Sequence, residues 1–137
     1  MRFNSGQISE AFDAAIQACK AGEPVHIVGH SAGATTAIRL TKMLYGSGWT
    51  LTSLNTIDPV GEEYFSLPPV FAMNYVQTSI PLSGSLLRGA HANNFVIDGV
   101  ELPPGEWLAH RALSLDRRVQ HGIVGTILAR RKPCDPL

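Results

Sequence analysis

One short segment, Val25 to Ala34, constrains the fold more than any other part of the chain; its sequence is VHIVGHSAGA. An apolar run is followed by the pattern G-x-S-x-G at Gly29 to Gly33 and then by residues typical of a helix. In this setting the serine lies on a sharp strand-to-helix turn, and its neighbours must be small because the helix passes close to the strand. The sequence therefore predicts Ser31 as a nucleophile and the backbone N–H of Ala32, at the helix start, as an oxyanion donor.

The apolar residues on both sides of this turn predict alternating helices and strands. Helical spacing predicts helices at Ser9 to Ala21, from Ser31 to about Tyr45, and at about Leu115 to Ala129. Short apolar or alternating runs predict strands at Val25 to Val28, Thr52 to Ile57 and Ala72 to Thr78, and a small edge strand at Asn94 to Ile97. Because two strands joined by one helix form a parallel unit, we expect one α/β domain over residues 1–137. Its small, mostly parallel sheet is flanked by helices on both faces.

Composition excludes several classes of partner. The formal net charge is zero and 45% of the residues are hydrophobic, which gives no reason to expect nucleic acid or an anionic membrane as a partner. We expect no transmembrane segment and see no signal peptide, so a cytoplasmic location is the default expectation. Cys19 and Cys134 have neither metal-site nor disulfide-framework spacing, and no metal or cofactor is expected.

A nucleophilic serine needs a carboxylate and a base, which follow it in the order Ser, Asp or Glu, His in α/β enzymes of this kind. The acid is expected just beyond the carboxyl end of a later strand, where functional groups gather in parallel sheets. Asp58 lies at that place, in the run LNTIDPV, and Pro59 fixes the chain as it leaves the strand. Asp98 fits a turn better, and Asp116 fits the first turn of the last helix.

Five histidines compete for the role of base. His26 and His30 precede Ser31, and His121 falls on the solvent side of the last helix. His110 follows all three main strands and lies shortly before an amphipathic helix that anchors its loop, so we predict it as the base. His91, in the glycine-rich loop after the third strand, is the alternative base.

These residues resemble the serine esterases and lipases of the α/β-hydrolase superfamily. The resemblance rests on GHSAG at Gly29 to Gly33, TIDPV at Thr56 to Val60, and HRALSLDRRV at His110 to Val119. An acid placed directly after the strand that follows the nucleophile helix is similar to the arrangement in the pancreatic lipase group. The run NYVQT at Asn74 to Thr78 is also similar to a bacterial lipase-like subgroup, in which Ser31, Asp58 and His110 take the triad positions.

The resemblance covers the second half of the family's fold, so it implies a minimal or truncated α/β-hydrolase core. Family members have several strands before the nucleophile strand, and a loop after one of them supplies the second oxyanion N–H. Only about two dozen residues precede the nucleophile strand here, so these strands and this loop are missing and Val25 to Val28 is left as an exposed apolar edge. We expect Met1 to Gln7 or a second copy of the chain to cover this edge and to supply the missing donor, which makes a homodimer the expected assembly.

The function that follows is hydrolysis of carboxylic esters through an acyl-enzyme on Ser31, with a small ester or lipid-like molecule as substrate. Loops around Tyr64, Phe65, Leu86 and Trp107 are expected to form an apolar acyl surface. Two alternatives remain. The missing oxyanion loop favours a catalytically impaired interaction module, whereas acyl transfer to an acceptor other than water uses the same triad.

Overall fold

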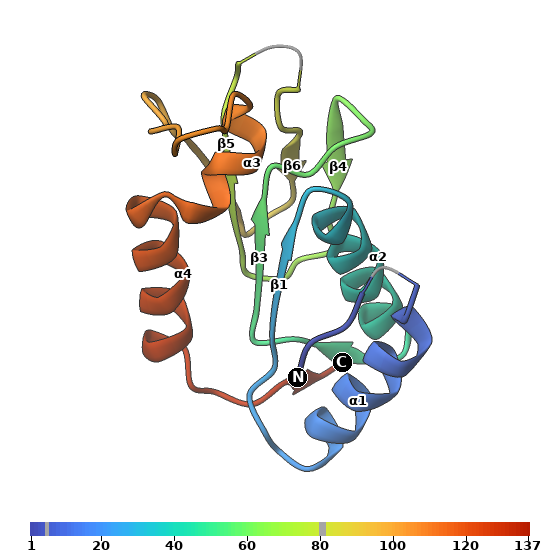
Figure 1. Ribbon diagram of the computed structural model, residues 1–137. Coiled ribbons are helices and arrows are strands. Elements are labelled where there is room, and N and C mark those ends of the chain that lie inside the picture. The colour runs from blue at the N-terminus through green and yellow to red at the C-terminus, as the bar shows by residue number, and fades with distance from the viewer. Residues whose placement is uncertain (5, 80–81) are drawn as a thin grey trace.

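A parallel sheet forms the centre of the computed structural model, which describes residues 1–4, 6–79 and 82–137 (Figure 1). Its four strands lie in the order β1-β3-β5-β7, and each neighbouring pair is parallel. The strands are β1 (His26–His30), β3 (Ser53–Ile57), β5 (Ala72–Val76) and β7 (Ala92–Val96). The predicted α/β class with a mainly parallel sheet is therefore confirmed.

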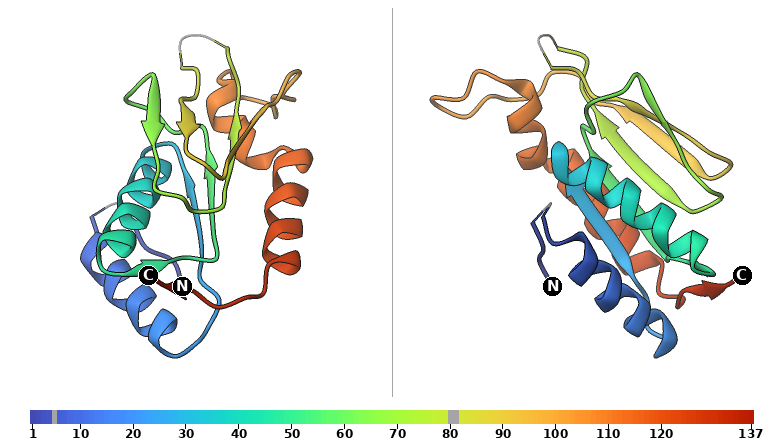
Figure 2. Two further views of the ribbon diagram at one scale, coloured as in Figure 1. Left: turned by 180° about the vertical axis from the view of Figure 1, so that it is seen from behind. Right: turned by 90° about the vertical axis from the view of Figure 1, so that its right-hand side faces the viewer.

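Helices cover both faces of this sheet, as Figures 1 and 2 show. On one face lie α1 (Ile8–Lys20) and α2 (Ala32–Gly46), and on the other lies α4 (Arg117–Ala129). The short α3 (Ala109–Ala112) lies beyond the carboxyl ends of the strands and continues into the 3₁₀ turn η1 (Leu113–Leu115). Helical periodicity predicted the three long helices to within about two residues at each end, which is the usual uncertainty of helix boundaries.

The chain passes from β3 to β5 and from β5 to β7 through short strands where a parallel sheet commonly has helices. These are β4 (Tyr64–Ser66) and β6 (Leu86–Arg88), which pair in parallel. Phe65 and Leu87 are buried in the same core cluster as residues of α1 and α2, so this pair completes the cover on that face. A further small pair joins β2 (Trp49–Thr50) to β8 (Asp135–Pro136). All of these strands are too short for periodicity to predict them.

Two apolar cores result, one on each face of the sheet. The first contains Ala15, Ala37, Ile38, Leu40, Leu44, Leu51, Leu54, Phe65, Ala72 and Leu87. The second, under α4, contains Ile57, Tyr75, Leu113, Val119 and Ile123. Because helices or short strands cover the sheet on both faces, β3 is buried at every position, as is expected for a central parallel strand.

A row of polar side chains crosses the sheet at one register. Thr56 pairs with Asn74 and Asn74 with Asn94 in the strand register. The Thr56 hydroxyl donates to Asn74 Oδ1 over 2.7 Å, and Asn74 Nδ2 donates to Asn94 Oδ1 over 2.9 Å. Asn94 also accepts from Leu87 N and donates to Leu87 O, which ties β6 to the sheet. Buried polar groups need such partners, so this row fixes the alignment of β3, β5 and β7.

β1 is an edge strand, as the sequence predicted, because β3 is its one neighbour in the described sheet. Val28, at its middle, is 49% exposed. A groove of about 640 Å³ runs beside the strand and is lined by β1, α1, α2 and residues 1–4. Residue 5, in the segment expected to cover the edge, lies outside the described residues. Separately, in the described part of the chain no helix is long and apolar enough to cross a membrane.

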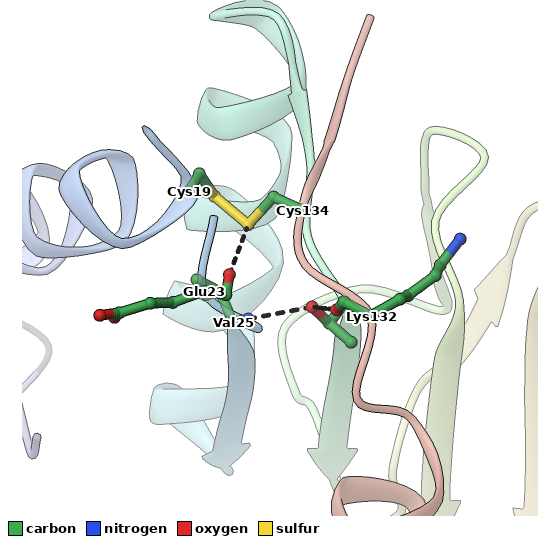
Figure 3. Close-up of a disulfide and its surroundings, with 6 residues drawn as sticks. Cys19, Glu23, Val25, Lys132 and Cys134 are labelled. Atoms are coloured by element: carbon green, nitrogen blue, oxygen red, sulfur yellow. Dashed lines mark hydrogen bonds between the residues drawn. A yellow bond between two sulfur atoms is a disulfide. The ribbon is translucent and has the colours of Figure 1, made fainter. Parts of the chain in front are cut away.

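A disulfide between Cys19 and Cys134 joins the end of α1 to the C-terminal segment (Figure 3). The sequence interpretation, which found no disulfide spacing, is corrected here: the cysteines are 115 residues apart, and the fold brings their Cα atoms to 5.2 Å. Beside the bond, Val25 N donates to the Thr52 hydroxyl and that hydroxyl donates to Lys132 O, both over 2.9 Å. The C-terminal segment is thus tied to the start of β1.

Candidate active site

Ser31 occupies the turn between β1 and α2 with a backbone φ of 58°, in the left-handed region that residues other than glycine rarely adopt. Its N–H donates to Ile57 O over 2.9 Å, which holds the turn against the end of β3. A Cβ on Gly29 would lie 2.3 Å from Gly33 O, a backbone atom that cannot move aside. The small residues of the motif therefore serve the close strand–helix approach that the sequence predicted.

Asp58 directly follows β3 and is fully buried. Its backbone also has a positive φ, of 49°, and its N–H donates to Tyr75 O over 2.8 Å. Strained backbone of this kind persists where the surroundings hold it, and it clusters at functional sites. Here the backbone conformation directs the Asp58 carboxylate over the carboxyl edge of the sheet toward His110 on α3.

His110, on α3, joins the other two side chains. Its Nε2 lies 2.8 Å from Ser31 Oγ, and its Nδ1 lies 2.7 Å from Asp58 Oδ2. The His110 side chain is 7% exposed. An ionised carboxylate is an acceptor only, so Nδ1 carries the proton and Nε2 is left to accept from the serine hydroxyl. The structure thus brings together the three residues that the sequence singled out from different parts of the chain.

Two residues that the sequence did not single out hold the segment carrying His110. His30 Nε2 donates to His110 O over 2.9 Å, and the two rings lie 5.3 Å apart. Glu106 Oε1 accepts from Trp107 N and Leu108 N over 3.0 and 2.9 Å, just before α3 begins. His30 precedes Ser31 in the chain and was not predicted as the base, yet its place beside Ser31 brings its ring to the backbone of His110.

The alternative base, His91, is not brought to the site. It is exposed and immediately precedes β7, and its carbonyl accepts from Ala72 N at the start of β5. Ser31 and Asp58 lie at the carboxyl ends of the strands, whereas His91 lies at the amino ends, so His91 is too far away to act as the alternative base. The cause is the register, because the loop carrying His91 has already returned to the start of the sheet before β7 begins.

The remaining candidate histidines and acids lie outside the Ser31–His110–Asp58 series. His121 is exposed on α4, as expected. His26 Nδ1 lies 2.7 Å from the Ser53 hydroxyl, and burial lowers the pKa of this imidazole. Asp98 is exposed, and Asp116 caps α4 by accepting from Arg118 N over 2.8 Å. Hydrogen bonding from the Arg118 side chain lowers the pKa of Asp116.

Ala32 is the first residue of α2, so its N–H has no carbonyl partner within the helix. This N–H, next to Ser31 at the positive end of the helix dipole, is the candidate oxyanion donor. Among residues 1–4 and 6–25, α1 is the one regular element that precedes β1. The elements described ahead of β1 thus include no strand whose following loop supplies a second donor.

A pocket of about 260 Å³ borders His110. Its apolar lining comes from Leu82, Val100, Leu102, Trp107 and Leu108. Of the four residues expected to form an acyl surface, Trp107 alone lines this pocket. Phe65 is buried in the core instead, and Tyr64 and Leu86 belong to the paired strands β4 and β6.

No group of three or more side chains in the described residues is arranged to hold a metal ion. Comparisons with known proteins give no assignment: no protein-family model matches the chain, and no significant match was found among curated proteins or solved structures. What the site can do therefore has to be argued from its own chemistry.

Proposed function

We propose that this chain is a serine hydrolase of the α/β-hydrolase type that cleaves carboxylic esters through an acyl-enzyme on Ser31. The observation that carries the proposal is the continuous hydrogen-bonded series Ser31–His110–Asp58, with contacts of 2.8 and 2.7 Å. Such a series recurs on unrelated folds wherever a hydroxyl is activated for acyl transfer, and it is recognised by geometry and not by sequence position.

In the proposed reaction, His110 Nε2 removes the hydroxyl proton as Ser31 Oγ attacks the ester carbonyl. Asp58 holds the imidazole in the required tautomer and stabilises its charged form. The Ala32 N–H donates to the oxyanion of the tetrahedral intermediate, which collapses when His110 returns the proton to the leaving alcohol. Water, deprotonated by the same histidine, then releases the acid and restores Ser31.

The pocket beside His110 has apolar side chains in its lining, which favour esters with a hydrophobic portion. It is lined by leucine, valine and tryptophan side chains next to the base, and Trp107 is 69% exposed. Burial of a hydrocarbon chain against these side chains contributes about 0.8 kcal/mol per CH₂ group. A small or lipid-like carboxylic ester is therefore the proposed substrate, and acyl transfer to another alcohol would use the same residues.

A fluorophosphonate probe tests the proposed nucleophile. We expect the intact protein to become labelled on Ser31, because the probe reacts with a serine that an adjacent base activates. Ser31→Ala is expected to take no label, and Ser66→Ala, which removes an exposed hydroxyl on β4, is expected to label like the parent. An unlabelled parent protein, or equal labelling of Ser31→Ala, would show that the site is not a serine hydrolase and would favour the interaction module.

We also propose that a second copy of the chain covers the open edge of β1. An exposed apolar edge strand is a template for pairing, and Val28 is its half-exposed centre. We expect sedimentation to report twice the 14.8 kDa chain mass. Val28→Lys should shift the protein to monomer, whereas the control Val124→Lys, on the exposed side of α4, should not. A parent protein that stays monomeric at all concentrations would rule the dimer out.

A further inference from the structure

Asp58 has a second set of partners besides His110, and both come from Gln77. The backbone N–H of Gln77 donates to Asp58 Oδ1 over 3.0 Å, and its side-chain Nε2 donates to Asp58 Oδ2 over 2.7 Å. Gln77 follows β5 directly, on the strand next to the one that Asp58 follows, and it is 1% exposed. Each carboxylate oxygen thus receives one N–H from the same residue.

The Gln77 side chain is itself held at both ends. Its Nε2 also donates to Leu82 O, and its Oε1 accepts from Ser79 N over 2.7 Å. Its backbone carbonyl accepts from Gly84 N over 3.0 Å. With all of these groups occupied, the amide has one orientation, in which one side-chain N–H is directed at Asp58 Oδ2 and the other at Leu82 O.

Gly84 closes the other side of the carboxylate. A Cβ at this position would lie 2.1 Å from Asp58 Oδ1 and 2.9 Å from a methyl carbon of Val76. Glycine is therefore required for this backbone to approach Asp58 so closely. Because Asp58 is fully buried, bulk water does not reach its carboxylate to replace the hydrogen bonds from Gln77.

We propose that Gln77 is a positioning residue for the acid of the site: its two N–H groups fix the Asp58 carboxylate so that Oδ2 faces His110 Nδ1. A carboxylate oxygen accepts more than one hydrogen bond, so Oδ2 serves Gln77 and His110 together. Removing the side-chain amide deprives Oδ2 of a charge-assisted bond and weakens the hold on its direction toward His110. This inference rests on the proposed function, because it concerns how well His110 acts as base.

Gln77→Met, which keeps the side-chain length and removes the amide, tests the proposal. We expect kcat for a chromogenic ester to fall about 10- to 100-fold, the effect of losing one hydrogen bond to a charged group, with KM changed less than about threefold. In ¹H NMR, the downfield signal of the His110 Nδ1 proton is expected to shift or broaden. Gln120→Met, at an exposed glutamine that donates to Ser114 O, is the matched control and should change neither reading.

Gln77→Glu is the second variant, because it keeps the acceptor for Ser79 N and places a carboxylate against Asp58 in place of the donor. We expect a larger loss of kcat than in Gln77→Met. Full activity and an unchanged Nδ1 signal in either folded variant would overturn the proposal. So would loss of native circular dichroism in both variants, which would make Gln77 a residue of the fold alone. If the parent protein lacks esterase activity, the proposed function fails, and the NMR signal still decides whether Gln77 positions Asp58.

Discussion

His110→Ala is expected to lower kcat for ester hydrolysis by about 10⁴- to 10⁶-fold, the range found when the base of such a series is removed. The imidazole is the one group within hydrogen-bonding distance of both Ser31 Oγ and Asp58 in the described structure, at 2.8 and 2.7 Å. Without it the hydroxyl keeps its proton, because Asp58 makes no direct hydrogen bond to Ser31. Steady-state rates on a chromogenic ester, measured with the unfolding midpoint of each variant, provide the measurement.

The matched control is His91→Ala, which changes the other candidate base at the opposite end of the sheet. We expect its kcat to remain within about twofold of the parent, since exposed positions rarely perturb a site or the fold. If His110→Ala were fully active, or if His91→Ala lost as much activity as His110→Ala, the assignment of the base would be wrong. Fluorophosphonate labelling should fall in parallel with kcat, because both report the reactivity of Ser31.

Local patterns in the sequence were sufficient to place Ser31 and Asp58. The glycine spacing around Ser31 reports a turn that only small residues permit, and the turn predicts the strand and helix on either side. Asp58 follows a short apolar run, and parallel strands bring their carboxyl ends to one edge. The prediction of these two residues therefore depends on local pattern and on one general rule of sheet topology, and it needs no alignment.

The role of His91 and the contacts of Gln77 depend on long-range register, which local pattern does not contain. His91 and His110 are both loop histidines after the third strand, and only the pairing of β7 with β5 places His91 at the amino ends. In the sequence, Gln77 is a polar residue near the end of an alternating strand. The proposed positioning role of Gln77 could be inferred only from the structure, which places Asp58, 19 residues earlier, within hydrogen-bonding distance.

The paired strands β4 and β6 escaped sequence analysis for a different reason. Each has three residues, and each lies in a stretch rich in turn residues. Phe65 and Leu87 are the one buried side chain of each strand, and both pack in the core with α2 and the sheet. One buried residue between two exposed ones carries no period, so tertiary packing and not strand propensity determines these elements.

Removing the disulfide with Cys19→Ser or Cys134→Ser is expected to lower the free energy of unfolding by about 2 to 5 kcal/mol. The bond joins residues 115 apart, and the entropy that a crosslink removes from the unfolded chain grows with the length of the loop it closes. For a domain whose total stability is about 5 to 15 kcal/mol, this is a large fraction. Urea unfolding of the parent, each variant and the parent in dithiothreitol measures it.

Activity should survive this loss of stability in native buffer. The disulfide lies beside Val25 at the start of β1 (Figure 3). Ser31 lies beyond the carboxyl end of that strand, so breaking the disulfide is expected to leave the contacts of His110 in place. The serine variants are therefore expected to keep kcat while their urea midpoint falls. Equal urea midpoints for the oxidised and reduced parent would contradict the prediction. Because disulfides persist in oxidising compartments, a stabilising bond here argues against the cytoplasmic default and for function in such a compartment.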